Sequence, residues 1–146
     1  MRKVLLPVDG SDSAFQAALY LIDLIQKHGP VEVHVVNVQP KPQEWQTHGM
    51  EKEAISDHLA VDAHLALKPI LHVLNEKNVA CQTHTKLGDP AETLVALADE
   101  LGCDHIVMGT RGLGAISGIV LGSVTRKVLH LANVPVICIK NEPGRR

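Results

Sequence analysis

Short apolar runs rich in β-branched residues alternate along this chain with longer segments whose apolar residues recur at helical spacing. The first pattern is typical of buried strands, and the second is typical of helices with one packed face. We predict strands over residues 4–8, 31–38, 79–86, 105–108 and 134–139. We predict helices from Ser11–Ser13 to His28, over about residues 51–75, from Pro90 to Leu101 and over about residues 123–132.

Start and stop residues mark the ends of these helices. Ser11, Asp12 and Ser13 offer side-chain oxygens that can cap the first helix, and Gly29-Pro30 stops it. The second helical segment contains Pro69 in its interior. Because proline removes one backbone hydrogen bond there, we expect this helix to kink or to split in two.

Strands that alternate with helices pair in parallel, because each helix carries the chain back over the sheet in a right-handed crossover. The pattern predicts an α/β fold, a doubly wound five-stranded parallel sheet with helices on both faces. We interpret residues 1–146 as a single domain, since no linker or internal repeat is visible. Ligands of such folds bind beyond the carboxyl ends of the strands. We therefore searched Asp9-Gly10-Ser11, Val38-Gln39, Leu87-Gly88-Asp89 and the segment after Met108.

Composition narrows the classes of partner. Lys and Arg number 14 against 16 Asp and Glu, a formal charge of −2, which argues against a nucleic-acid binder. Phe15, Tyr20 and Trp45 are the only aromatic residues, so a stacking platform for single strands is missing. No apolar stretch approaches the ~20 residues that cross a bilayer, and we expect no membrane partner. Three cysteines without a C-x-x-C motif disfavour a disulfide scaffold or zinc ribbon and indicate a reducing cytoplasm.

The segment from Gly109 to Ser123 is rich in glycine, follows a predicted strand and opens a predicted helix. Glycine lets backbone N–H groups approach a ligand, and the N-terminus of a helix favours negative charge. Gly122 and Ser123 can thus hold phosphate oxygens, with Arg111 as the one nearby cation. The alternative is a glycine-rich loop without a ligand, in which Ser123 serves only as the N-cap.

Two other phosphate motifs do not fit. A P-loop requires lysine after its last glycine, and no glycine in this chain is followed by lysine. The spacing of Gly112, Gly114 and Gly118 is close to the dinucleotide fingerprint, but that fingerprint belongs after the first strand. The sequence therefore favours neither a Walker-type NTPase nor an NAD enzyme.

The spacing Gly109-x-x-Gly112, nine residues, then Gly122-Ser123 resembles the G-2x-G-9x-G-[ST] signature of the universal stress protein family. The resemblance extends over nearly the whole chain, and the complete signature is similar to that of the ATP-binding branch. Its other motifs are Leu6-Pro7-Val8-Asp9-Gly10-Ser11, Val36-Asn37-Val38, Gly88-Asp89-Pro90-Ala91-Glu92 and Val134-Pro135-Val136. The resemblance implies a Rossmann-like strand order of 3-2-1-4-5.

The resemblance also implies a role for each matching residue in binding ATP. The implied contacts are Pro7 and Asp9 near the ribose or adenine, Val38 on the adenine, Met108 and Gly109 at the ribose and first phosphate, Arg111 and Gly112 in the phosphate loop, and Gly122, Ser123, Val124 and Thr125 at the distal phosphates. Mg²⁺ would be carried by the phosphates, because no cage of carboxylates is visible. Without an aromatic residue at a strand end, adenine would lie between aliphatic walls such as Val38.

Several of these residues also have structural interpretations. Asp9 is a natural turn or cap residue, and we interpret Asp89 and Glu92 as the start of a helix. His58 and Asp62 lie four apart on one predicted helix and can share a face, which we assign to solvent rather than to a metal. No catalytic triad can be assembled, so enzyme status stays open.

The resemblance further implies a homodimer paired through the last strand, which lies at the edge of the sheet. The function it implies is that of a dimeric, cytoplasmic, ATP-binding regulator of the stress response. Two alternatives stay open. One is an interaction module with a vestigial nucleotide loop, and the other is a slow ATP hydrolase.

Overall fold

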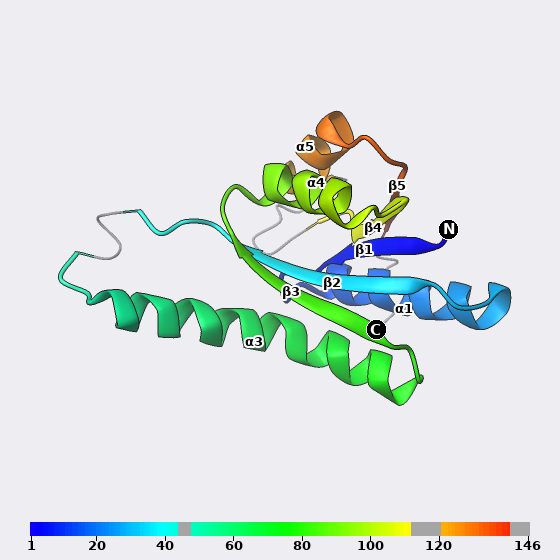
Figure 1. The fold of residues 1–146 in the computed structure, drawn as a ribbon, viewed down its shortest axis with the longest axis horizontal. Coiled ribbons are helices and arrows are strands. Elements are labelled where there is room, and N and C mark those ends of the chain that lie inside the picture. Colours follow the sequence, from blue (N-terminus) through cyan, green and yellow to red (C-terminus); the bar gives the residue numbers. More distant parts are fainter. Residues whose placement is uncertain (44–47, 112–120, 141–146) are drawn as a thin grey trace.

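The computed structural model describes residues 1–43, 48–111 and 121–140. Its elements in chain order are β1 Lys3–Pro7, α1 Asp12–His28, β2 Glu32–Gln39, α3 Lys52–Glu76, β3 Cys81–Leu87, α4 Pro90–Leu101, β4 His105–Gly109, α5 Ser123–Leu131 and β5 Val136–Ile139. The strands form one parallel sheet in the order β3-β2-β1-β4-β5 (Figure 1). The predicted fold class and strand order are confirmed.

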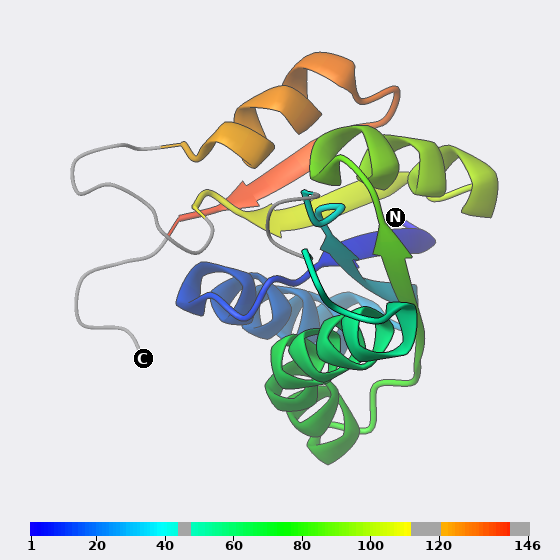
Figure 2. The ribbon, with the colours of Figure 1, turned by 90° about the vertical axis from the view of Figure 1, so that its left-hand side faces the viewer.

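The sheet lies between two helical layers. Figure 2 looks onto the carboxyl ends of the strands, with α1 and α3 on one face and α4 and α5 on the other. Alternate residues of β1 point to opposite faces, so Leu6 packs in the core beneath α1 and α3 and Leu5 in the core beneath α4 and α5. Both cores are almost wholly aliphatic, as the scarcity of aromatic residues requires.

The predicted helix starts are confirmed in detail. Ser11 is the N-cap of α1, where its side chain accepts a hydrogen bond from the N–H of Ala14. Asp89 caps α4 in the same way by accepting from the N–H of Glu92, which confirms the structural interpretation of this pair. Each cap satisfies an N–H group that has no partner inside the helix.

We expected a kink or a split at Pro69, and helix α3 is continuous through this residue, so it does not split in two. All of its buried residues lie from Ala63 onward and flank the proline on both sides. Their packing against the sheet stabilises the helical path that the missing hydrogen bond would otherwise interrupt. The amino-terminal half of α3 projects past the carboxyl ends of the strands (Figure 1).

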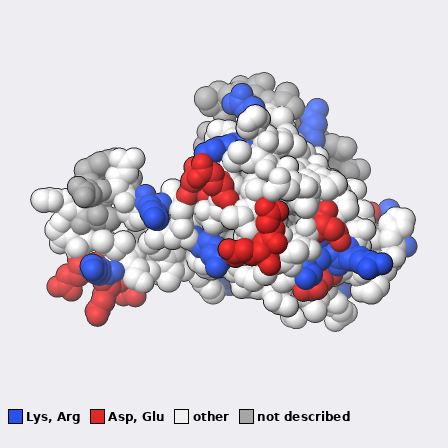
Figure 3. Space-filling model, turned by 45° about the horizontal axis from the view of Figure 1, so that its top comes forward, with Lys and Arg blue, Asp and Glu red and all other residues white. Residues whose placement is uncertain are grey.

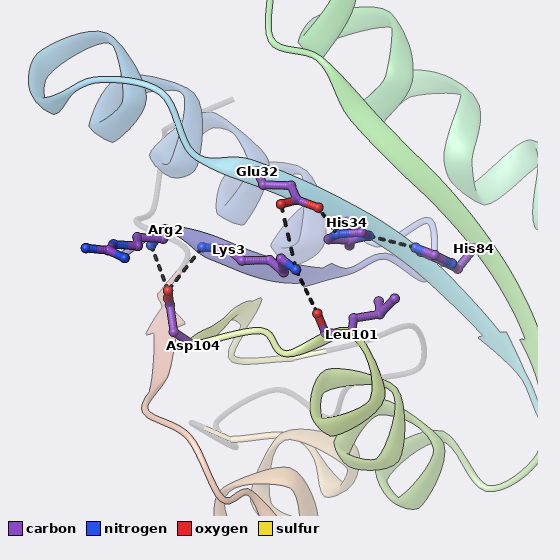
Figure 4. Close-up of polar contacts among 7 residues, drawn as sticks. All are labelled: Arg2, Lys3, Glu32, His34, His84, Leu101 and Asp104. Carbon is purple, nitrogen blue, oxygen red and sulfur yellow. Dashed lines mark hydrogen bonds and ion pairs between the residues drawn. The ribbon is translucent and has the colours of Figure 1, made fainter.

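A polar cluster lies at the amino ends of the strands (Figure 4). The carboxylate of Asp104 accepts hydrogen bonds from the N–H groups of Arg2 and Lys3 at 2.8 and 3.1 Å and contacts His105 Nδ1 at 2.7 Å. Burial by itself would raise the pKa of Asp104, but these hydrogen bonds outweigh it and lower the pKa to about 2. The carboxylate thus ties β1 to the start of β4 in its charged form.

Beside it, Glu32, His34 and His84 form a chain across β2 and β3 (Figure 4). His34 is buried, with Nε2 2.9 Å from Glu32 Oε1 and Nδ1 2.8 Å from His84 Nε2. Burial lowers the pKa of His84, and neighbouring His34 and Lys86 lower it further. With both imidazoles neutral, each of these two contacts can have one donor and one acceptor: His84 Nε2–H donates to His34 Nδ1, and His34 Nε2–H donates to Glu32. Sequence reasoning missed this cluster, because only the pairing of β2 with β3 brings residues 34 and 84 together.

Candidate functional site

A cavity of about 950 Å³ lies at the carboxyl ends of β1, β2 and β4. Its volume is near the upper end of the roughly 300–1,000 Å³ typical of small-molecule sites. Ten of the eleven residues predicted to bind ATP line it: Pro7, Asp9, Val38, Met108, Gly109, Arg111, Gly122, Ser123, Val124 and Thr125. The eleventh, Gly112, lies outside the described residues. The cavity is where the fold class predicts a ligand.

Asp9 follows β1 and has the turn role that its position suggested. Its Oδ1 accepts a hydrogen bond from the N–H of Ser11 at 2.9 Å, and this bond orients the chain as it enters α1. Asp9 also lines the cavity, so this turn forms part of the cavity wall. A turn role and a ligand role are therefore compatible at this residue.

The wall at the end of β2 depends on Asn37, to which sequence reasoning assigned no role. Asn37 is 1% exposed, and its Nδ2 donates to the carbonyl of Val8 at 2.9 Å. Its Oδ1 accepts from Gln39 Nε2 at 2.7 Å. These bonds join the ends of β1 and β2 and orient Val38 and Gln39, which both line the cavity. An asparagine between Val36 and Val38, near the end of a predicted strand, was the available signal.

Gly109 ends β4, where helix α1 approaches the backbone very closely. A side-chain carbon at Gly109 would lie 2.6 and 2.7 Å from the backbone carbon and oxygen of Ser13, too close for any L-residue. The glycine is therefore required by the packing of α1 on β4, whether or not a ligand binds. Ser13 Oγ also accepts from the N–H of Arg111 at 3.2 Å, and this bond ties the next residues to α1.

Helix α5 begins at the cavity without a side-chain cap. Gly122 is its N-cap, and Ser123 is its first helical residue, so the alternative in which Ser123 is the N-cap is wrong. The N–H groups of Ser123, Val124 and Thr125 have no carbonyl one turn earlier in the helix to bond. The hydroxyl of Thr125 already donates to the carbonyl of Gly109 at 3.0 Å, which fastens α5 to β4. What α5 offers a ligand is therefore mainly backbone N–H.

One wall of the cavity comes from α3, through Asp62, Leu65 and Ala66. These residues were not predicted, because nothing local in the sequence relates the long second crossover to the ends of the strands. His58 and Asp62 do share a face, with Nε2 and Oδ2 3.6 Å apart, and His58 is 71% exposed. In the described part of the chain, no three His, Cys, Asp or Glu side chains gather in a way that could hold a metal ion.

The charges around the cavity are separated. Asp9 and Asp62 lie on the β1 and α3 side, whereas Arg111 and Arg126 lie on the β4 and α5 side. Because Arg126 lines the cavity as well, the expectation that Arg111 is the one nearby cation is wrong. The outer face of α4 and α5 differs from the cavity in its charge distribution, because acidic and basic side chains are interspersed on that face (Figure 3). On that face Lys127 Nζ lies 3.1 Å from Asp89 Oδ2 and 3.5 Å from Glu92 Oε1.

A doubly wound parallel sheet with a cavity beyond its strand ends defines a Rossmann-like α/β protein. Residues 1–140 match the model of the universal stress protein family. The chain belongs to this family, and the resemblance inferred from its motifs is confirmed. Among the described residues, no helix is both long and apolar enough to span a membrane.

The chain is similar to universal stress protein MJ0531 of Methanocaldococcus jannaschii, with 33% identity over 146 residues that cover 95% of this chain and 82% of the relative. A solved structure, the hypothetical protein MJ0577, has a TM-score of 0.81 at 25% identity and covers 98% of both chains. The universal stress protein of Archaeoglobus fulgidus, solved in complex with dAMP, has a TM-score of 0.67 at 29% identity, with 96% of this chain and 98% of that chain covered.

Proposed function

We propose that this chain binds ATP, with Mg²⁺ carried by the phosphates, and acts as a dimeric cytoplasmic regulator of the stress response. In this proposal residues 1–146 form one nucleotide-binding domain. The observation that carries it is the cavity at the strand ends, which terminates on the uncapped start of α5. Unpaired N–H groups at a helix N-terminus are a general anion-binding arrangement.

The adenosine would occupy the side of the cavity formed by β1, β2 and α3. Val38 and Met108 provide aliphatic surface for the base, and Met108 is 6% exposed, so it also belongs to the core. Pro7 and Asp9 lie at the end of β1, where the carboxylate can accept hydrogen bonds from ribose hydroxyls. Gly109 brings backbone close to the sugar and the first phosphate.

The phosphates would lie against α5 and the segment after β4. The N–H groups of Ser123, Val124 and Thr125 would donate to phosphate oxygens, and Arg111 would supply a cation. Gly112 would complete the loop. Mg²⁺ fits this side because it binds phosphates with few protein ligands and retains its waters. That a universal stress protein with 29% identity was solved with dAMP supports an adenine nucleotide.

Titration calorimetry on nucleotide-stripped protein tests the proposal. The unaltered chain is expected to bind ATP saturably. The double variant Gly122→Val, Ser123→Val is expected to lose at least tenfold in affinity, because two β-branched side chains at the start of α5 keep phosphate away from the backbone N–H groups and the Ser123 hydroxyl is lost. The matched control is His130→Val, which places the same side chain on an exposed position in the last turn of α5. Equal ATP binding by the double variant would contradict the phosphate site. Mass spectrometry of nucleotide extracted from the native protein would identify the ligand independently.

The competing candidate is an interaction module whose nucleotide loop is vestigial. It is favoured by β5, an edge strand whose four residues are all partly exposed. No binding of ATP at millimolar concentration by a chain that still dimerises would support it. Slow hydrolysis is a third candidate, and ATP turnover that Asp9→Ala abolishes while binding persists would support it.

A further inference from the structure

The separation of charge around the cavity bears on which nucleotide the cavity prefers. Both carboxylates of its lining lie toward the adenosine side, on β1 and α3, and both arginines lie toward the phosphate side. A ligand that is neutral at one end and highly anionic at the other suits such a cavity. The anionic end of a nucleoside triphosphate carries more charge than that of a monophosphate.

Arg126 stands out among the basic residues of α5. It lines the cavity, and no carboxylate of the described residues lies within ion-pair distance of it. The adjacent Lys127 is instead occupied by Asp89 and Glu92. Two neighbouring cations of one helix therefore face different surroundings, one an ion-pair network and the other an open cavity.

The position of Arg126 in its helix is unfavourable without an anion. The first turns of α1, α3 and α4 carry Asp12, Glu53 and Glu92, whereas the first turn of α5 carries no acidic residue. A cation close behind a helix N-terminus is repelled by the helix dipole. A polyanion at the start of α5 would relieve this repulsion and contact the guanidinium as well.

We propose that Arg126 is a specificity-determining residue, which makes the cavity prefer adenine nucleotides with several phosphates over the monophosphate. The guanidinium donates charge-assisted hydrogen bonds to the phosphates farthest from the ribose, which AMP lacks. This inference rests on the proposed nucleotide binding. It differs from the contacts that the resemblance implies, because those end at Thr125 and do not include Arg126.

The test is the ratio of ATP to AMP affinity, measured by calorimetry on the full chain with Mg²⁺. We expect Arg126→Gln to weaken ATP binding about fivefold to tenfold, the effect of losing one partly exposed charged contact, while AMP affinity changes less than twofold. Lys127→Gln removes the same charge from the same helix and is expected to leave both affinities within twofold. Arg126→Lys should restore part of the ATP affinity.

Three outcomes would overturn the assignment. They are an unchanged ATP affinity in Arg126→Gln, equal losses for ATP and AMP, and an equal loss of ATP affinity in Lys127→Gln. The last would show an effect of net charge rather than a contact. Failure of the unaltered chain to bind either nucleotide would instead contradict the proposed function itself. Circular dichroism of each variant verifies that the fold is retained.

Discussion

Gly109 shows that a signature residue can have a purely structural requirement. The motif presents it as part of a phosphate loop, but the backbone of Ser13 fills the space where its side chain would lie. The role of this glycine in packing α1 on β4 could not be predicted from spacing. Asn37 is the converse case, a buried amide that joins two strand ends although the motif that contains it assigned it no role.

We expect Gly109→Ala to lower the free energy of unfolding by about 3 kcal/mol, because the added carbon meets backbone that cannot rotate away. The measurement is urea denaturation. Gly102→Ala is the control, since Gly102 has a φ of 68° and nothing within 4 Å of an added carbon. There we expect only the strain of a left-handed residue, about 1 kcal/mol. Equal losses in the two variants would contradict the packing argument.

Asp104 makes a pH-dependent contribution to stability. Its pKa is about 2 in the folded chain and 3.8 in the reference state, so the folded state favours the charged form. The stabilisation is fully present above about pH 4 and is lost as the pH falls toward 2. Because the side chain is 39% exposed and solvent screens its contacts, we expect Asp104→Ala to cost about 1 kcal/mol at pH 7.

Urea denaturation of both proteins between pH 7 and pH 2.5 measures this contribution. The difference between the unaltered chain and Asp104→Ala should shrink toward the acid end. A difference that is the same at both ends would show that the loss comes from packing rather than from the charge of Asp104.

Among the elements, α3 departs most from what its sequence suggests. Pro69 has no N–H to donate to the carbonyl of Leu65, yet the helix passes through it unbroken. The α3 residues that line the cavity lie before the proline, and the buried residues of α3 flank it on both sides. Helix propensity alone could not decide between a kink and a break, because burial on the sheet outweighs it.

We expect Pro69→Ala to raise the free energy of unfolding by about 1–2 kcal/mol, because alanine restores the donor and is the better helix former. Urea denaturation measures the gain. Lys68→Ala, at the neighbouring exposed position, controls for the effect of alanine itself and should change stability by less than 0.5 kcal/mol. A loss of stability in Pro69→Ala would show that the helix needs the bend that proline permits.

Among the described residues, β5 pairs with β4 alone and forms one edge of the sheet, which bears on the proposed dimer. The carbonyls of Pro135 and Ile139 accept hydrogen bonds from β4, at 3.0 and 3.1 Å, from the N–H groups of Ile106 and Thr110. Because successive residues of a strand direct their backbone groups to opposite sides, the N–H of Cys138 faces the open edge. No other described residue accepts a hydrogen bond from this group, which suits it to pairing with a second copy.

We expect Cys138→Pro to raise the dissociation constant of a β5-paired dimer roughly tenfold. Proline has no N–H to donate, and in a dimer with twofold symmetry the hydrogen bond from residue 138 is lost in both copies. Analytical ultracentrifugation measures it. Cys138→Val keeps the N–H and a similar volume and serves as the control. Equal dissociation constants for both variants would place the interface elsewhere, and a chain that is monomeric throughout would contradict the dimer.

The sequence by itself determined the alternation of strands and helices, their caps and the class of fold, because periodicity and capping are local properties. It also indicated the strand ends and the glycine signature where a ligand would bind. Only the tertiary structure decided that α3 closes one wall of the cavity, that Arg126 joins Arg111 there, and that His34 meets His84. These relations depend on strand register and on the paths of the crossovers, which bring together residues that no local pattern relates.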